Sequence, residues 1–195
     1  MPDSPDRLPA PPPAHSAVLW SDYICPWCYL GQDRTALLRS FGVRVTARPY
    51  ELHPGLPVDG IPSDRRYSGI AAACADAGLP FNPPTLVPNS RRALATAEAV
   101  RLTSPDAFDA FDRALFAAYF VDGRNIGDPD VLAELVVSSG ATPVGYEPHL
   151  VKTSMDQAYD AGVSGTPAWW IDNRLMIPGV QDRSYYERMV ERLNR

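Results

Sequence analysis

The chain has 195 residues, of which 45% are hydrophobic, and a formal net charge of −5. This length and composition allow one domain with a real core, or one domain that carries an insertion, without stabilising disulfides. The negative charge provides no global positive field for gathering nucleic acid or anionic membrane, so we expect neither as a partner. Three cysteines over this length do not resemble a secreted disulfide framework, and we expect a cytoplasmic location.

The first sixteen residues are rich in proline and lack the apolar run of a secretory signal. Four of their prolines lie between residues 9 and 13, which favours an extended and solvated segment. No stretch of the sequence approaches the length of a transmembrane helix. We therefore predict a disordered tail over residues 1–16 and expect the fold to begin at Ala17.

The pattern after this tail predicts a strand, a helix and a second strand. Ala17–Tyr23 is an apolar run, typical of a strand that is covered on both faces. A helix-like stretch follows over Tyr29–Phe41. Pro26, just before it, suits the first turn of this helix, and Gly42, just after it, suits a C-terminal cap. Val43–Tyr50 alternates apolar with polar residues, as a half-buried strand does. This order is a βαβ unit.

The middle of the chain is predicted to be helical. Loops that contain proline and one short helix, near Asp64–Ala77, come first. Longer helices are then expected at Ser90–Thr103, Ser104–Asp122, Asp128–Gly140 and Glu147–Ala161. The pair Arg91-Arg92 is expected on a solvated helix face rather than at an anion. A run of helices between two sets of strands indicates a helical subdomain inserted into a mixed sheet domain, which we place at residues 63–161.

Strand character returns at Ala168–Ile171 and Leu175–Ile177, which we expect to form a tight antiparallel hairpin. Asp182 is expected to cap a last helix. The predicted order is therefore βαβ, helices, ββα, with the sheet domain divided between residues 17–62 and 162–195. The predicted fold class is α/β.

The sequence Cys25-Pro26-Trp27-Cys28 lies where the first strand gives way to the first helix. Two cysteines separated by two residues at such a place indicate a thiol-disulfide redox site. Their offset puts both sulfurs on one helical face, close enough to form a disulfide. If Cys25 lies at the start of the helix, the backbone N–H groups and the positive helix end favour its thiolate. We therefore predict that Cys25 is the nucleophile and Cys28 the resolving thiol.

The alternative for this cysteine pair is half of a zinc site. Four ligands would require Cys74 together with His15, His53 or His149, none of which belongs to a second short-spaced pair. We therefore predict no metal. Cys74 lies in an alanine-rich stretch and is interpreted as structural, although an exposed third thiol would form mixed disulfides.

Asp22 is a candidate proton acceptor for Cys28, because the resolving thiol must lose a proton before it attacks a mixed disulfide. The alternative for Asp22 is a solvated or capping residue at the end of a strand. Trp27, Tyr23 and Tyr29 either form an apolar rim that receives unfolded or peptide substrate, or pack against the inserted helices.

Pro167 enters the late hairpin although it has no N–H group for a sheet. A proline at such a place is either an edge residue or a cis proline whose preceding backbone can bind a peptide. The sequence alone leaves both interpretations open.

These motifs together resemble the DsbA-like thioredoxin superfamily, particularly its FrnE-like cytoplasmic branch. The resemblance spans about Ala17 to Leu193. It rests on Trp20–Gly31, Val163–Pro167, Arg48–Pro54, Asn89-Ser90 and Ala118–Phe120. It implies a thioredoxin fold interrupted by a helical domain, dithiol-disulfide exchange, and a cis Pro167 packed against the cysteine pair.

One departure from this resemblance concerns Trp27, because DsbA itself has histidine before its second cysteine. The stabilisation that a histidine lends to the Cys25 thiolate is absent here, so a strongly oxidising potential is not carried over. The redox direction, whether oxidase, reductase or isomerase, stays open.

The sequence therefore predicts a thiol-disulfide oxidoreductase, with disulfide isomerase activity as a further expectation and no metal or organic cofactor. Its expected partners are protein or peptide thiols and disulfides, with glutathione or a thioredoxin-like protein for turnover; the oligomeric state is left open. Pro26, Trp27, Thr166 and Pro167 are the candidate substrate-binding residues.

Two alternative functions remain. One is a glutathione-dependent isomerase of a small aromatic compound, similar to 2-hydroxychromene-2-carboxylate isomerase. Such enzymes typically lack the second cysteine, so Cys28 weighs against this alternative. The other is a holdase-like binder that uses the aromatic rim.

Overall fold

The computed structural model describes residues 15–63 and 67–194. Its main sheet is mixed, with the strand order β2-β1-β5-β6. Strands β1 and β2 are parallel, whereas β5 is antiparallel to both β1 and β6. The bounds are β1 (His15–Ser21), β2 (Val43–Pro49), β5 (Ala168–Ile171) and β6 (Leu175–Pro178). The strand that leads to the cysteine pair, β1, is therefore central, which fixes the position of the site.

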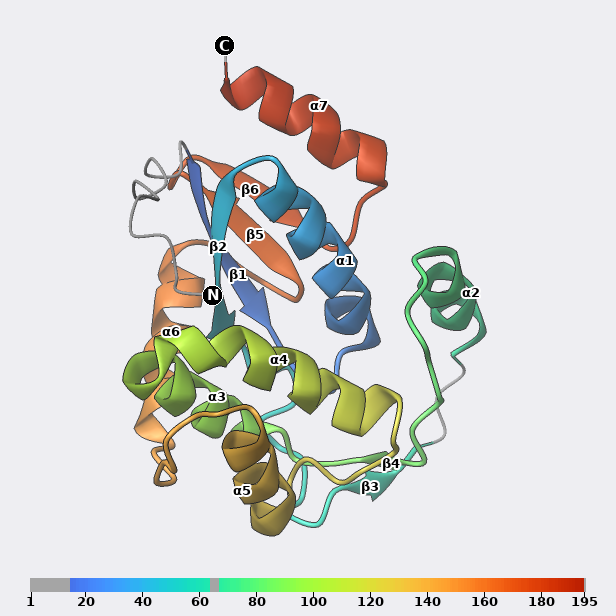
Figure 1. Cartoon of the computed structure of the whole chain (residues 1–195), viewed down its shortest axis with the longest axis vertical. Helices are drawn as coiled ribbons and strands as arrows, with labels where there is room; N and C mark the ends of the chain where they lie inside the picture. Colours follow the sequence, from blue (N-terminus) through green and yellow to red (C-terminus); the bar gives the residue numbers. More distant parts are fainter. Residues whose placement is uncertain (1–14, 64–66, 195) are drawn as a thin grey trace, which may run out of the picture.

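Helices α1 and α7 pack together beside the sheet, with α2 lying apart from them near α1 (Figure 1). Helices α3 to α6 pack with one another, and α3 and α6 also contact β2. The bounds are α1 (Pro26–Ser40), α2 (Ser68–Asp76), α3 (Arg91–Thr103), α4 (Pro105–Phe120), α5 (Pro129–Ser138), α6 (His149–Asp160) and α7 (Arg183–Leu193). Two short strands, β3 (Ile61–Pro62) and β4 (Leu86–Val87), pair with each other in the connecting loops. Along the chain, helices α2 to α6 thus come between the strand pair β1 and β2 and the strand pair β5 and β6, as the sequence pattern predicts.

Both faces of the sheet are covered. Leu19 and the fully buried Trp169 pack on one face among residues of α1 and α7. Trp20 packs on the opposite face against Ala158 of α6. Burying a large apolar side chain contributes about 1.5–3 kcal/mol, so this alternation holds the sheet between two helical layers. The prediction that both faces of the first strand are covered is confirmed.

The inserted helices have a hydrophobic cluster of their own, centred on α4 side chains such as Phe111 and Leu115. Cys25 and Cys28 belong to this cluster rather than to the cluster on the sheet. The cysteine pair therefore lies at the seam between the sheet domain and the inserted helices.

Several predicted boundaries shift. Strand β1 begins at His15 rather than Ala17, because the Asp172 carboxylate accepts hydrogen bonds from the Ser16 N–H at 2.9 Å and from His15 Nδ1 at 2.7 Å. Residues 1–14 of the predicted tail, and residues 64–66 of the predicted short helix, lie outside the described residues. Helix α1 begins at Pro26, three residues before the predicted start.

The turn and cap predictions are partly confirmed. Asp172 and Asn173 have φ values of 50° and 54° in the β5-β6 turn, the left-handed geometry that a tight hairpin needs. Asp182 lies at the N-cap of α7, but its side chain makes no capping hydrogen bond. Asp128 does cap α5, by accepting the Asp130 N–H at 2.8 Å.

No helix among residues 15–63 and 67–194 is both long and apolar enough to cross a membrane.

Candidate active site

The cysteine pair lies in the turn that starts α1. Cys25 is the N-cap residue, with an extended backbone (φ −88°, ψ 114°), and Pro26 is the first helical residue. The Cys25 carbonyl accepts the N–H groups of Cys28 at 3.0 Å and Tyr29 at 3.2 Å. The Cys25 N–H donates to the Asp22 carbonyl at 3.0 Å, which closes the turn after β1. Cys25 therefore occupies the positive end of the helix, as expected.

The two thiols differ in acidity. The pKa of Cys25 is lowered, first because Cys28 donates a hydrogen bond to the Cys25 sulfur, while burial opposes this shift. The pKa of Cys28 is raised well above its ordinary value by burial and by the same hydrogen bond. Both side chains are almost fully covered, at 5% and 2% exposure. The arrangement favours a thiolate at Cys25 and a protonated thiol at Cys28.

The Thr166-Pro167 segment lies against this pair. The Thr166-Pro167 peptide bond is cis, as the resemblance implies. The Cys25 sulfur lies 3.8 Å from the Thr166 carbonyl oxygen, at the long end of a sulfur hydrogen bond. The Thr166 side chain lowers the pKa of both cysteines, against the effect of burial. Its hydroxyl oxygen is buried and has no nitrogen or oxygen partner among the described residues.

Gly31 brings α1 close to the start of β5. A Cβ atom at this position would lie 3.3 Å from the Trp169 ring and 3.7 Å from the Pro167 ring. Trp169 is fully buried and donates from its ring N–H to the Thr35 hydroxyl at 3.2 Å. Only a residue without a side chain fits this approach comfortably, and the approach holds the cysteine turn beside Pro167.

The three aromatic residues around the pair divide between the two predicted roles. Tyr23 and Tyr29 are buried, and their rings pack against the inserted α4. The ring centroids of Tyr23 and Phe116 are 4.7 Å apart, and those of Tyr29 and Phe120 are 5.1 Å apart. Only Trp27 of the three is exposed, at 46%. An apolar rim of all three residues is therefore wrong, because two of them join the sheet domain to the insertion.

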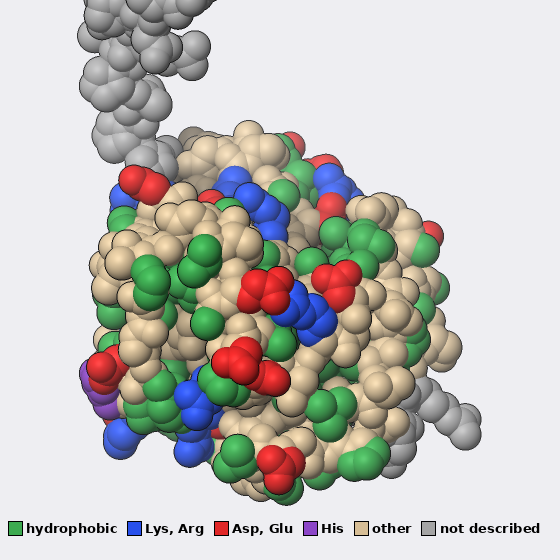
Figure 2. Space-filling model, turned by 60° about the horizontal axis from the view of Figure 1, so that its bottom comes forward, with side chains coloured by type: hydrophobic (Ala, Val, Ile, Leu, Met, Phe, Trp, Pro, Cys, Tyr) green, Lys and Arg blue, Asp and Glu red, His purple; other side chains and the backbone are tan. Residues whose placement is uncertain are grey.

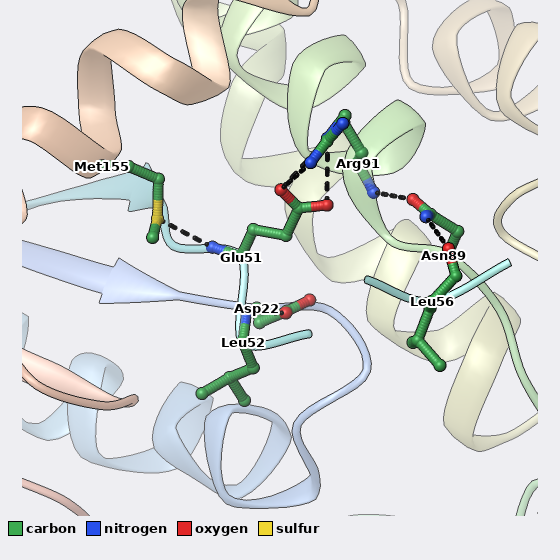
Figure 3. Close-up of polar contacts among 7 residues, drawn as sticks. All are labelled: Asp22, Glu51, Leu52, Leu56, Asn89, Arg91 and Met155. Carbon is green, nitrogen blue, oxygen red and sulfur yellow. Dashed lines mark hydrogen bonds and ion pairs between the residues drawn. The ribbon is translucent and has the colours of Figure 1, made fainter. Parts of the chain in front are cut away.

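Asp22 is completely buried, so the solvated form of the alternative is wrong, whereas a capping role fits its bond from the Ile24 N–H. Its carboxylate accepts the N–H groups of Leu52 at 2.9 Å and Ile24 at 3.3 Å, together with a hydrogen bond from the Ser90 side chain. Figure 3 shows this carboxylate beside Leu52. Burial raises the pKa of Asp22 to about 6, although the hydrogen bonds oppose the shift. A role as proton acceptor for Cys28 stays a prediction.

Arg91 lies on a partly exposed helix face, at 43% exposure, and pairs with a carboxylate of the same chain. Its guanidinium forms two-pronged contacts of 2.9–3.1 Å with the carboxylate of Glu51, which is only 5% exposed (Figure 3). Asn89 accepts the Arg91 N–H at 3.0 Å and donates to the Leu56 carbonyl at 2.7 Å. These contacts join the loop after β2 to the start of α3. The neighbouring Arg92 lies 4.3 Å above the ring of Tyr146.

The residues considered for zinc are engaged in other contacts. Cys74 is fully buried in α2, where burial raises its pKa to about 11, in keeping with a structural role. His15 is paired with Asp172 and His149 with Glu147. In the part of the chain that the structure describes, no group of three His, Cys, Asp or Glu side chains could hold a metal ion.

The fold and the cysteine turn define a thioredoxin-type redox protein with a helical insertion. Residues 17–191 match the family of the DSBA-like thioredoxin domain. The chain belongs to this family. The predictions of the DsbA-like family, of an α/β thioredoxin fold with a helical insertion and of a dithiol-disulfide oxidoreductase are confirmed at this level.

Three solved structures resemble the chain at low sequence identity. A probable DsbA oxidoreductase from Streptomyces coelicolor, SCO1869, has a TM-score of 0.80 at 21% identity, covering 92% of this chain and 89% of that one. The cytosolic disulfide reductase DsbM from Pseudomonas aeruginosa with GSH has a TM-score of 0.67 at 18% identity, covering 91% and 98%. A 2-hydroxychromene-2-carboxylate isomerase has a TM-score of 0.70 at 18% identity, covering 92% and 96%. At these identities the likeness shows the fold alone.

Proposed function

We propose that the chain is a cytoplasmic thiol-disulfide oxidoreductase of the FrnE-like branch, which works through Cys25 and Cys28. The observation that carries this proposal is the placement of two cysteines in one helical turn, with Cys25 at the N-cap of α1 and Cys28 buried behind it. Cys25, at the helix N-terminus, has a lowered pKa, whereas the pKa of Cys28 is raised. An acidic outer thiol attacks, and a protonated inner thiol resolves the mixed disulfide.

In the reducing direction, the Cys25 thiolate attacks one sulfur of a substrate disulfide. A bond forms between Cys25 and that sulfur, and the other substrate sulfur leaves as a thiolate. Cys28 then loses its proton and attacks the Cys25 sulfur, which forms the Cys25-Cys28 disulfide and releases the second substrate thiolate. The substrate gains two electrons and the cysteine pair loses two. In the oxidising direction a substrate thiolate attacks Cys25 of the oxidised pair.

The surface beside Cys25 suits an extended peptide or a small thiol. Trp27 offers an exposed aromatic ring, and the Thr166 carbonyl oxygen lies 3.8 Å from the Cys25 sulfur. Pro26 and Pro167 directly follow Cys25 and Thr166 in the chain. Backbone that approaches from this side can bind to the segment before Pro167. The candidate substrates are therefore protein or peptide thiols and disulfides.

Glutathione is the proposed co-substrate. Two glutathione thiols can return the oxidised pair to the dithiol, with the electrons moving between sulfurs and no metal or organic cofactor taking part. The structure of DsbM with GSH supports this choice by analogy of fold. Figure 2 shows acidic and basic side chains interspersed on the face that it draws, which gives that face no broad basic patch for nucleic acid.

The test of this proposal is turnover of insulin or of a protein with scrambled disulfides, with glutathione as reductant. Cys25→Ser is expected to abolish turnover, because no attacking thiolate remains. Cys28→Ser is expected to leave a mixed disulfide trapped on Cys25. Full turnover by the Cys25→Ser variant would refute the assignment, and Cys74→Ser serves as the control for thiol chemistry elsewhere.

A second candidate is a glutathione-dependent isomerase of a small aromatic compound, which the fold likeness to 2-hydroxychromene-2-carboxylate isomerase favours. This activity would need one cysteine only, so Cys28→Ser would retain it. The buried hydrogen bond between the two sulfurs favours the redox function instead. Isomerisation of such a compound by the Cys28→Ser variant would decide for the isomerase.

A further inference from the structure

The inner side of Cys28 faces a pocket that the exchange mechanism above does not use. This pocket, of about 290 Å³, lies between α1, α4 and the sheet. Leu19 and Phe116 line its apolar part, whereas Gln32 and Asp112 line its polar part. A space this large with several polar groups admits water. Water in this pocket would reach the Cys28 side chain from the side of α4.

Gln32 indicates that the pocket holds hydrogen-bonding molecules. It lies four residues after Cys28 on α1 and therefore on the same helical face. Its side-chain nitrogen is buried and has no hydrogen-bond partner among the described residues. An unsatisfied buried donor costs about 1–3 kcal/mol, and water in the pocket would satisfy it.

Two carboxylates line this pocket together with Cys28, and Asp112 is the more buried of the two, since the exposed Asp109 pairs with Arg39 at 2.9 Å. Asp112 accepts a hydrogen bond from the Tyr23 hydroxyl at 2.7 Å, and the pKa of Tyr23 is raised so far by burial that the phenol stays a donor. Burial raises the pKa of Asp112 to about 6, and Asp109 adds to this, while Tyr23, Arg39 and Arg113 oppose it. Asp112 therefore changes charge just below neutral pH.

Asp22, the carboxylate nearest to the pair in sequence, is held differently. Its oxygens accept the hydrogen bonds of Leu52, Ile24 and Ser90, and it does not line the pocket. Its contact with Cys28 is made by the backbone N–H rather than by the carboxylate. Through these hydrogen bonds the Asp22 carboxylate connects the loop after β2 to the turn before α1.

We propose that Asp112 accepts, through water in this pocket, the proton that Cys28 loses when it resolves a mixed disulfide. This inference rests on the proposed redox function. The Cys28 S–H bond breaks, the proton passes through water to the carboxylate, and the Cys28 thiolate forms its bond to the Cys25 sulfur. The bond between Cys25 and the substrate breaks, and the substrate leaves as a thiolate. The inserted helix α4 thus supplies a residue for the chemistry of the sheet domain.

The test follows reduced protein after rapid mixing with dithiobis(nitrobenzoate). Attack by Cys25 releases a first coloured thiolate, and resolution by Cys28 releases a second. In Asp112→Asn the first phase should be unchanged and the second about 10-fold or more slower near pH 7, because a positioned base typically contributes at least this factor. Asn can still accept the hydrogen bond of Tyr23, which preserves that contact.

The pH profile separates proton transfer from a purely structural effect. In the wild type the second phase should accelerate as pH rises through about 6, where Asp112 ionises, and then level off. In Asp112→Asn it should keep rising into the alkaline range, following Cys28 alone. Asp106→Asn, the same charge change on an exposed residue of α4 outside the pocket, should behave as wild type.

A second variant guards against misfolding of Asp112→Asn. Gln32→Leu removes the unsatisfied donor and makes the pocket less polar, so it should keep or raise the midpoint of thermal unfolding while slowing the second phase. A wild-type second phase in both Asp112→Asn and Gln32→Leu would overturn the inference, as would slowing in Asp22→Asn alone. Release of a single thiolate by the wild-type pair would instead refute the proposed dithiol function.

Discussion

At the scale of single residues, the chemistry depends on where each thiol lies relative to α1. Cys25 is the N-cap and accepts a hydrogen bond from Cys28, which lowers its pKa. Cys28 lies one turn further in, where burial raises its pKa. The side chain between them, Trp27, is apolar and half exposed, so it adds no charge to the Cys25 thiolate. Trp27 is therefore the residue through which the redox potential can be changed.

Replacing Trp27 by histidine should make the pair more oxidising. An imidazole beside the Cys25 thiolate stabilises it, and we expect the pKa of Cys25 to fall by about 1 unit. A change of this size corresponds to about 1.4 kcal/mol and therefore to about 30 mV in the potential of a two-electron couple. Thiolate absorbance against pH measures the first quantity and glutathione equilibration the second. Trp27→Phe is the matched control, and equal potentials for the two variants would contradict this explanation.

The buried Asp22 should make stability depend on pH. Its pKa is raised in the folded state to about 6, from 3.8, so the folded state binds the proton more tightly than the unfolded state. Its contribution is fully present below about pH 4 and is lost as pH rises through about 6, a loss on the order of 1–3 kcal/mol. Urea unfolding at a series of pH values should show the difference between wild type and Asp22→Asn changing across this window. A difference that does not vary with pH would refute the assignment.

At the scale of elements, the loop after β2 is the part that connects sheet and insertion. Its Leu52 N–H donates to Asp22 beside the cysteine turn, and its Glu51 carboxylate pairs with Arg91 at the start of α3 (Figure 3). The Glu51 N–H also donates to the Met155 sulfur of α6 at 3.1 Å. This loop, together with the rings of Tyr23 and Tyr29, therefore helps to fix the inserted helices relative to the active site.

Replacing Arg91 should lower the free energy of unfolding more than replacing Glu51, its partner in the ion pair. The Glu51 side chain is 5% exposed and that of Arg91 is 43% exposed. Arg91→Leu leaves a buried carboxylate without its cation and should lower the free energy of unfolding by about 3 kcal/mol. Glu51→Gln leaves a cation that water can reach and should cost about 1 kcal/mol. Urea unfolding measures both.

The control for this comparison is the exposed pair of Arg124 and Glu134. Glu134 is 65% exposed, so Arg124→Leu should change the free energy of unfolding much less than Arg91→Leu does. Equal effects of Arg91→Leu and Arg124→Leu would show that the loop after β2 is not held by its ion pair.

At the scale of the whole molecule, the features predicted from sequence are those with a local signal. The cysteine turn, the helix that follows it and the late hairpin each have their own residue pattern, and all three are present, with the helix starting three residues earlier than predicted. The contacts that bring distant segments together have no such pattern. Arg91 reads as a surface residue until Glu51, forty positions earlier, is folded against it. Asp112 likewise resembles any polar residue of an amphipathic helix until α4 packs beside Cys28.

The central claim is that Cys25 and Cys28 form one redox couple in which Cys25 is the reacting thiol. A redox titration against glutathione, with adducts located by mass spectrometry, tests it directly. We predict an intramolecular disulfide of Cys25 and Cys28, a potential more negative than the value of about −120 mV known for DsbA, and a glutathione adduct on Cys25 when Cys28 is replaced by serine. An adduct confined to Cys74, or the absence of a disulfide between Cys25 and Cys28, would contradict the claim.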